Sequence, residues 1–361
     1  ITLSGRNLSL IYGLSSNTSS PIVAAAMETP IKPDIRDLNR QELGDWLTDQ
    51  GFKKYALTQV VNWLYSKKMQ SFDEMTNISK TLRETLKENF IFQNIEYREK
   101  VESEDKTQKI LYALADGNLV ESVLIPHVTR TTLCVSSQVG CAMGCQFCNT
   151  AQMKLVRNLT TSEILNQVME AQSRLEEGVK ITNIVFMGMG EPLHNFKNVM
   201  AAMDYLTDDN GFCIAPKRVT ISTSGLVPEI KEIAAHSKAK LAVSLNATTD
   251  ELRSKLMPIN KKYPLKDLLE ACGQYVEAMQ RPVTFGYVML KGLNDSLEDA
   301  KRLVKLLSNI SCKINLIPYN AFPNSPFQTP DETSVNAFCR LLLDKNFRVN
   351  VRWGRGQDIN G

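Results

Sequence analysis

Residues 138–148 read Gln-Val-Gly-Cys-Ala-Met-Gly-Cys-Gln-Phe-Cys and place three cysteines at the spacing C-x3-C-x2-C. In so short a loop, the thiolates of Cys141, Cys145 and Cys148 can each bind one iron of a [4Fe-4S] cluster. The fourth iron then has no ligand from the loop and stays open to another molecule. The spacing therefore predicts a cluster that binds a further ligand at its free iron.

Two other kinds of metal site use cysteine clusters, and both require a fourth ligand. Structural zinc sites are closed by four ligands, and ferredoxin-type clusters use four cysteines. No second cysteine pair follows here, and His127, His194 and His236 each stand alone in the chain. A set of three cysteines is instead typical of radical S-adenosylmethionine (SAM) enzymes, in which SAM chelates the fourth iron. Zinc and a chance cluster of cysteines are the alternatives at this point.

The composition limits the class of protein. The chain has 361 residues, of which 43% are hydrophobic, which is enough for one large domain or for a large and a small one. No stretch approaches about 18 uninterrupted apolar residues, so no membrane span is expected. Eight cysteines, three of them at metal-binding spacing, favour a reducing, cytoplasmic compartment. The formal net charge of +3 permits a nucleic-acid partner without predicting one.

The first 130 residues divide into three segments. We expect residues 1–33 to be a disordered leader, with a transit peptide or translated sequence upstream of a start at Met27 as alternatives. Residues 34–94 carry apolar residues at helical spacing and predict a small helical accessory domain. Residues 95–130 predict a short β extension. The expected helices span 41–49, 57–65 and 72–90, and the expected strands span 95–101, 109–113 and 119–125.

Residues 131–361 alternate between strand and helix patterns. Repeated strand–helix units predict parallel strands joined by right-handed crossovers, so the fold class is α/β. Six units suit a partial (βα)6 barrel, in which ligands gather at the carboxyl ends of the strands. The expected strands span 132–137, 181–187, 218–223, 240–245, 283–290, 314–318 and 347–351, and the expected helices span 161–177, 196–207, 227–236, 264–280, 295–308 and 331–345.

Polar motifs follow these strands at the end where a barrel binds ligands. The cysteine loop follows the first strand, and Gly-Met-Gly-Glu-Pro (188–192) follows the second. Ser-Thr-Ser-Gly (222–225) follows the third, Ser-Leu-Asn (244–246) ends the fourth, and Asn320 follows the sixth. We therefore expect these segments to lie together beside the cysteines.

Five motifs in this order resemble those of the RlmN family of bacterial radical SAM methyltransferases. The resemblance implies a radical-SAM barrel that holds a [4Fe-4S] cluster and SAM and methylates carbon 2 of adenine in 23S rRNA and tRNA. The related Cfr methyltransferases, which act on carbon 8, are less similar because they carry alanine in place of Pro192. The resemblance runs from about residue 37 to residue 361 and rests on TLCVSSQVGC (132–141), MGMGEPL (187–193), ISTSG (221–225), MPINKKY (257–263) and KINLIP (313–318).

The resemblance also implies roles for individual residues. Cys141, Cys145 and Cys148 match the cluster ligands of the family. Glu121 matches the acceptor of the proton that leaves the base, and Cys134 matches a resolving cysteine that forms a transient disulfide. RlmN proteins usually carry histidine at position 246, so we expect an altered SAM contact there. The residues that match the SAM site are Gly190, Glu191, Ser222, Ser244, Leu245, Asn246 and Asn320.

Residue types alone leave two of these roles open, and one family residue is missing. A lone strand cysteine such as Cys134 is most often a small buried hydrophobe, and Glu121 also suits a solvated strand position. The family's methyl-carrying cysteine lies in an Ala-Cys-Gly-Gln run shortly after a segment matched here by residues 355–361, where the sequence given stops. We therefore expect this chain to bind cluster and SAM without completing methylation. The Ala-Cys-Gly-Gln at 271–274 lies inside an expected helix and is interpreted as coincidence.

The resemblance implies 23S rRNA and tRNA as partners, together with a reducing protein such as flavodoxin or ferredoxin, and a monomeric chain. Residues 53–55, 63–68 and 348–355 mix basic and aromatic side chains, a mixture that suits unpaired RNA. Solvated lysines over a core tryptophan are the alternative for the first two segments. Two other functions stay open: a carbon-8 adenine methyltransferase, and a non-catalytic iron–sulfur binding module.

Overall fold

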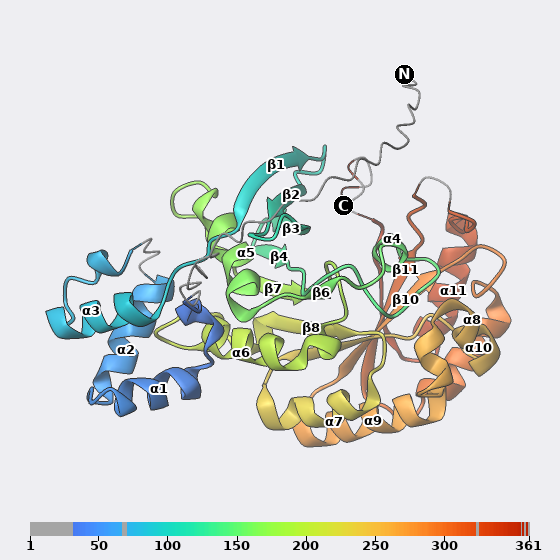
Figure 1. The fold of residues 1–361 in the computed structure, drawn as a ribbon. Helices are drawn as coiled ribbons and strands as arrows, with labels where there is room; N and C mark the ends of the chain where they lie inside the picture. The colour runs from blue at the N-terminus through green and yellow to red at the C-terminus, as the bar shows by residue number, and fades with distance from the viewer. Residues whose placement is uncertain (1–31, 67–70, 323–324, 355, 357–358, 360–361) are drawn as a thin grey trace, which may run out of the picture. The chain divides into compact units, whose positions relative to one another are not determined.

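Figure 1 shows the computed structural model of the chain, which describes residues 32–66, 71–322, 325–354, 356 and 359. The chain divides into two compact units, residues 1–32 and residues 33–361. The leader predicted for residues 1–33 lies outside the described residues except for its last two positions. None of the described helices is both long enough and apolar enough to cross a membrane.

A small helical module begins the second unit. Its first helix starts with a capping box, in which Asn39 accepts from the backbone N–H of Glu42 and the Glu42 carboxylate accepts from that of Asn39. The single helix predicted over 72–90 is wrong, because Ser79 caps a separate helix by accepting from Leu82. The elements are η1 (Ile35–Asp37), α1 (Arg40–Asp49), α2 (Tyr55–Val61), the π-helical η2 (Asn62–Ser66), η3 (Phe72–Glu74) and α3 (Lys80–Asn89).

One ten-stranded sheet forms the body of the unit, in the order β1-β2-β3-β4-β7-β8-β9-β10-β11-β12. The pairs from β1 to β4 are antiparallel, and those from β4 to β12 are parallel. The strands are β1 (Glu96–Glu102), β2 (Gln108–Ala113), β3 (Leu119–His127), β4 (Arg130–Cys134), β7 (Asn183–Phe186), β8 (Val219–Thr223), β9 (Lys240–Ser244), β10 (Val283–Met289), β11 (Cys312–Pro318) and β12 (Arg348–Val351).

The parallel strands alternate with helices that cover one face of the sheet (Figure 1). This confirms the predicted partial barrel. Its helices are α5 (Thr161–Ser173), η4 (Pro192–Asn195), α6 (Phe196–Thr207), η5 (Pro216–Arg218), α7 (Val227–His236), α8 (Asp250–Leu256), η6 (Pro258–Lys261), α9 (Leu265–Met279), α10 (Leu297–Leu307) and α11 (Glu332–Asp344). Sequence patterns missed α8, the short α4 (Asn149–Gln152) and the small pair of β5 (Gln138–Val139) with β6 (Arg157–Asn158).

The two faces of the parallel strands differ in burial. Along β10, Phe285 and Tyr287 are buried, whereas Thr284, Gly286 and Val288 between them are half-buried. Successive strand side chains point to opposite faces, so the buried set packs under the helices and the other set lines the concave face. The same alternation in β8 and β11 makes this concave face continuous across the barrel.

Candidate functional site

The three cysteines lie in one loop between β5 and α4, which begins directly after Cys148. The loop folds back on its return segment, because the backbone N–H of Cys141 donates to the carbonyl of Lys154 at 3.2 Å. Gly140 adopts φ +73°, and a Cβ at this position would lie 1.6 Å from that carbonyl oxygen. Only glycine permits this close approach, so the residue before the first cysteine fixes the path of the loop.

The thiols of the loop are partly exposed and free. Burial raises the pKa of Cys141 to about 11 and that of Cys145 to about 12, and the charge of a Cys148 thiolate contributes to both increases. The three sulfurs are therefore near enough to repel one another when ionised. A bound cation favours the thiolates that ligate it, so this donor set suits a positively charged iron cluster.

The number of thiols distinguishes between the two kinds of metal site considered above. A closed zinc site requires four ligands around a single ion, whereas a [4Fe-4S] cluster open at one iron requires three thiolates. The three free thiols of the loop match the ligand number of the cluster.

Glu191 follows β7 and is almost fully buried, with 3% of its surface exposed. One carboxylate oxygen accepts from the backbone N–H of Ser224 at 2.7 Å, and the other accepts from that of Leu193 at 3.1 Å. Its own backbone N–H donates to the side-chain oxygen of Gln138 at 2.8 Å. Burial raises the pKa of Glu191. This residue thereby connects the loops after β7 and β8 to the strand that leads into the cysteine loop.

Gly190 makes a second close approach next to Glu191. It adopts φ +100°, and a Cβ here would lie 2.5 Å from the Cβ of Gln138. A side chain at position 190 would therefore separate the β7 loop from the segment before the cysteines. This packing is a structural requirement for glycine in addition to the predicted contact with SAM.

A buried guanidinium connects the ends of β8 and β9. Arg253, on α8, is 0% exposed and donates to the carbonyl oxygens of Ser224 at 2.7 Å, Ser244 at 3.0 Å and Leu245 at 3.1 Å. It also donates to the side-chain oxygen of Asn260 at 3.0 Å. Burial lowers the pKa of Arg253 to about 10. Sequence reasoning missed this residue, because a single arginine in a short polar helix carries no local signal of burial.

Arg253 also lies beside the cysteine loop. Its positive charge acts to lower the pKa of Cys145, against the larger effect of burial. The backbone N–H of Gln146 donates to the carbonyl of Leu256 at 2.9 Å, which joins the loop to the end of α8. In the described residues, no carboxylate lies within ion-pair distance of Arg253. The site therefore contains a buried positive charge next to a predicted cluster ligand.

Asn246 follows β9 in the left-handed conformation, with φ +58°. Its side-chain oxygen accepts from the backbone N–H of Val288 at 2.8 Å, and its side-chain nitrogen donates to the sulfur of Met257 at 3.2 Å. Asparagine tolerates this conformation better than most residues. Both polar groups of the side chain are therefore engaged inside the protein, and the backbone carbonyl accepts from the side chain of Asn294 at 2.8 Å. The backbone N–H of Asn246 is the part left to contact a ligand.

The other residues predicted for the SAM site lie at the carboxyl ends of the same strands. Ser222 and Ser244 are half-buried near the ends of β8 and β9. Leu245 is fully buried, its backbone N–H donates to the carbonyl of Gly286 at 2.9 Å, and its carbonyl accepts from Ala247 and Arg253. Asn320 is exposed just after β11. The structure thus brings the predicted segments to one edge of the sheet.

Cys134 and Glu121 lie on neighbouring strands of the extension and the barrel. Cys134 is opposite Val123 in the β3–β4 pair, and Glu121 is two residues from Val123, so both side chains are on one face of the sheet. Burial raises the pKa of Cys134 to about 12. The Glu121 side chain is 41% exposed and pairs with Lys109 at 3.5 Å. All eight cysteines are free thiols, so the expected transient disulfide has no support in the structure.

Parts of the three segments predicted to contact RNA are exposed. Lys53, Lys54 and Tyr55 are exposed at the start of α2, where the two lysines line a hollow of about 550 Å³. Trp63 donates to the side-chain oxygen of Asn77 at 2.5 Å. Lys67, Lys68 and Arg355 lie outside the described residues. Arg348, Arg352 and Trp353 are exposed in the last segment.

Comparisons with known proteins agree with this arrangement. Residues 135–306 match the radical SAM superfamily, and residues 33–92 match the ribosomal RNA large subunit methyltransferase N-terminal domain. The chain is 51% identical over 329 residues to a dual-specificity RNA methyltransferase RlmN of Geotalea uraniireducens, covering 91% of this chain and 95% of that protein. The corresponding protein of Pelobacter propionicus is 50% identical over 91% of this chain and 94% of its own length.

A solved structure shows the same likeness in three dimensions. The crystal structure of a radical SAM methyltransferase from Sphaerobacter thermophilus superposes with a TM-score of 0.84 at 41% sequence identity. The match covers 91% of this chain and 97% of that one. It therefore includes the helical module, the β extension and the barrel.

Proposed function

Because the chain belongs to the RlmN family of radical SAM RNA methyltransferases, we propose that it serves the methylation of carbon 2 of adenine in 23S rRNA and tRNA. Residues 1–361 contain the proposed cluster and SAM sites but not the family's methyl-carrying cysteine, so this chain alone is expected to bind cluster and SAM without completing methylation. The observation that supports this most directly is the joining of the loops after β7, β8 and β9 through Glu191 and Arg253 beside three free thiols. Pro192, which follows Glu191 as the first residue of η4, is the residue type expected of RlmN rather than Cfr.

In this proposal, Cys141, Cys145 and Cys148 hold the [4Fe-4S] cluster used by the superfamily. When bound, that cluster supplies the electron for reductive cleavage of SAM. The protein contributes a loop that is fixed by Gly140 before the first thiol and by the contact of Gln146 with α8 after the second. Arg253 contributes a permanent positive charge that partly balances the thiolates.

The SAM contacts come from residues that already hold the strand ends together. Each oxygen of Glu191 accepts one protein N–H, which leaves further lone pairs for the amino group of SAM. Ser222 and Ser244 offer hydroxyls, Gly190 and Asn246 offer backbone N–H groups, and Asn320 offers an amide at the exposed end of β11. Leu245 lies between these groups with its own backbone bonded to Gly286, Ala247 and Arg253. Because most of these groups are fixed before SAM binds, little ordering is required on binding.

Glu121 and Cys134 serve the RNA base in this proposal. The Glu121 carboxylate accepts the proton that leaves carbon 2 of adenine, and its exposure on the sheet face leaves it accessible to a base. Cys134 is the resolving thiol and lies on the same sheet face. The target adenine leaves its stack to reach these groups, as bases do in other base-modifying enzymes.

The partners follow from the same proposal. RNA is the substrate, a flavodoxin- or ferredoxin-type protein supplies electrons, the chain acts as a monomer, and the compartment is the cytoplasm. Cysteines kept free of disulfides are consistent with a reducing compartment.

The test is the modified base itself. A gene that encodes this chain together with the family's methyl-carrying cysteine is placed in a bacterial strain whose tRNA and 23S rRNA lack 2-methyladenosine, and the RNA is digested and analysed by mass spectrometry. The proposal predicts 2-methyladenosine in both RNAs with the wild-type gene and none with the C141A variant. Accumulation of 8-methyladenosine, or of no methylated adenosine, would contradict it.

A further inference from the structure

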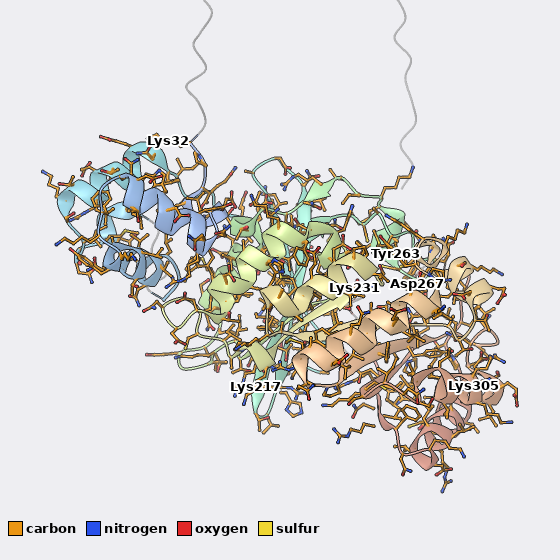
Figure 2. The ribbon with its side chains drawn as sticks, turned by 90° about the horizontal axis from the view of Figure 1, so that it is seen from below. Lys32, Lys217, Lys231, Tyr263, Asp267 and Lys305 are labelled. Carbon is orange, nitrogen blue, oxygen red and sulfur yellow. The ribbon has the colours of Figure 1, made fainter. Side chains whose placement is uncertain are left out.

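Basic side chains gather at the amino ends of the parallel strands, at the opposite edge of the sheet from the cysteine loop. Arg130 begins β4, Lys240 begins β9, Arg348 begins β12, and Lys313 is the second residue of β11. Lys217 and Arg281 each lie two residues before a strand, β8 and β10 respectively. Figure 2 labels Lys217, and it labels Lys231 and Lys305 on outer helices. We call this set the basic rim: Arg130, Lys217, Lys240, Arg281, Lys313 and Arg348.

Part of the basic rim faces the concave side of the barrel. Lys240 and Lys313 are exposed, and the next residue in each strand, Leu241 or Ile314, is fully buried under the helices. Strand alternation therefore directs the two lysines to the concave face. In the β11–β12 pair, Lys313 is the register partner of Arg348, so these two cations are neighbours on one face.

The cations of the basic rim influence one another and have no acidic partners among the described residues. Burial lowers the pKa of Lys240, and the charges of Lys313, Arg281, Arg130 and Lys217 lower it further. Among the described residues, no carboxylate lies within ion-pair distance of any member of the rim. Cations at the amino ends of six strands thus repel one another, which costs stability unless an anion binds.

A hollow of about 320 Å³ opens next to Arg348, at the amino ends of β10, β11 and β12. Its lining offers the hydroxyl of Ser311, the amide of Asn346 and the ammonium group of Lys345 in addition to the Arg348 guanidinium, whereas the Ser308 hydroxyl donates to the carbonyl of Lys305. Hydroxyl, amide and cationic donors are the groups that contact phosphate oxygens in nucleic-acid complexes. The hollow therefore adds hydrogen-bond donors to the charge of the rim.

We propose that the basic rim and this hollow bind the phosphate backbone of the RNA substrate, at a second contact surface remote from the cysteine loop. The proposal rests on the proposed function, which supplies RNA as the substrate. Strands of five to seven residues separate the rim from the cysteine edge, a distance of about 16 to 23 Å. A folded RNA covers such a distance, whereas the target adenine alone does not.

The test compares two variants that lose the same charge. The rim variant is K240Q/K313Q/R348Q, and the control is K231Q/K266Q/K305Q, which changes exposed lysines on α7, α9 and α10. Fluorescence anisotropy measures binding to an unmodified tRNA transcript and to a 23S rRNA fragment between about 50 and 200 mM salt. We expect the rim variant to bind about tenfold more weakly, with the slope of log affinity against log salt smaller by about 2 to 3, because each phosphate contact contributes about 0.7 to 0.9. The control should stay within about twofold of wild type.

A third variant, K240R/K313R/R348K, keeps the charges and should bind RNA like wild type. Thermal unfolding of all variants identifies any loss of affinity that comes from misfolding. If the rim variant and the control bind RNA equally, the inference is wrong and the proposed function is unaffected. If the rim variant instead binds a reduced flavodoxin more weakly with RNA affinity unchanged, the surface belongs to an acidic protein and the inference is also wrong. If wild type binds neither RNA, the proposed function and the inference fail together.

Discussion

The carboxylate of Glu191 accepts a hydrogen bond from the backbone N–H of Ser224 at 2.7 Å. This buried bond joins the loop after β7 to the loop after β8. The same residue donates its own N–H to Gln138, three positions before Cys141. One buried side chain thus holds together the cysteine loop and two loops of the proposed SAM site. Substitutions here therefore test structure and ligand binding at once.

Glu191→Gln should separate the charge of this residue from its hydrogen bonds. Glutamine can still accept from Ser224 through its one oxygen, whereas its NH2 group then faces the Leu193 N–H and it cannot offer a negative charge to the amino group of SAM. We expect SAM affinity to fall at least tenfold and the melting temperature of the apoprotein to fall less than in an alanine variant, because one of the two hydrogen bonds is kept and a buried charge is removed. Glu191→Ala should lower both. A melting temperature that falls equally in the two variants would contradict the separation.

Arg253→Met should destabilise the protein even before any cofactor binds. The carbonyls of Ser224, Ser244 and Leu245 lose their donor, and each buried acceptor left unsatisfied costs about 1–3 kcal/mol, offset in part by removal of a buried charge. We expect a loss of about 2–5 kcal/mol in the free energy of unfolding by urea. Arg253→Lys should recover only part of it, because an ammonium group does not match the fork of a guanidinium. Stability equal to wild type in R253M would show that these bonds contribute nothing.

Periodicity predicted most of the barrel because its elements alternate regularly. The bounds expected for 196–207 and 227–236 are those of α6 and α7. The helix predicted over 72–90 failed at Ser79, where a capping hydroxyl starts a new helix that apolar spacing does not reveal. The short pair of β5 with β6 was missed because two-residue strands depend on tertiary contacts rather than on local pattern.

The sequence predicts those parts of the candidate site that consist of short motifs of neighbouring residues. The cysteine spacing and the motifs after the strands predict Cys141 and Glu191 as site residues, because metal ligands and strand-end motifs have recognisable patterns, and these roles stay predictions. Arg253 was not predictable, since its partners come from strands 8 to 29 residues away in the chain. An altered SAM contact was predicted at Asn246 and stays a prediction; its side chain bonds to Val288 and Met257 in a conformation that no sequence pattern specifies.

Each cysteine of the loop should be required for iron. We expect C141A, C145A and C148A to contain little iron and sulfide after anaerobic reconstitution and to lose the broad absorption near about 400 nm. The matched control is C272A, because Cys272 is fully buried in α9 and lies in the Ala-Cys-Gly-Gln run interpreted as coincidence. Normal iron in any loop variant, or loss of iron in C272A, would show that the ligands are assigned wrongly.

Substitutions of Asn246 should change the free energy of unfolding according to how well the new residue adopts the left-handed backbone conformation. Both N246A and N246G lose the bond to the Val288 N–H, whereas only alanine places a Cβ without a polar group at φ +58°. The left-handed conformation costs a residue other than glycine about 1–2 kcal/mol. Urea unfolding should therefore find N246G more stable than N246A by about 1 kcal/mol. The reverse order would mean that the strain is relieved elsewhere.

The apoprotein should lose stability in alkali through the cysteine loop. The pKa of Cys141 is raised to about 11 and that of Cys145 to about 12, so the folded state holds these protons more tightly than the unfolded chain does. This contribution is complete below about pH 9, the ordinary thiol value, and is lost as pH rises through 11 to 12. Urea midpoints at about pH 8 and pH 10 should therefore diverge more for wild type than for C141A/C145A. Equal divergence would exclude the two thiols as the cause.

The most direct test of the account is the electron paramagnetic resonance spectrum of the anaerobically reconstituted, reduced protein with and without SAM. Three thiolates that leave one iron without a protein ligand predict a [4Fe-4S] signal that changes shape when SAM is added and that stays unchanged when a SAM analogue lacking the amino group is used. A protein without such a cluster, or a signal that SAM leaves unaltered, would contradict the claim that Cys141, Cys145 and Cys148 hold a cluster open to SAM.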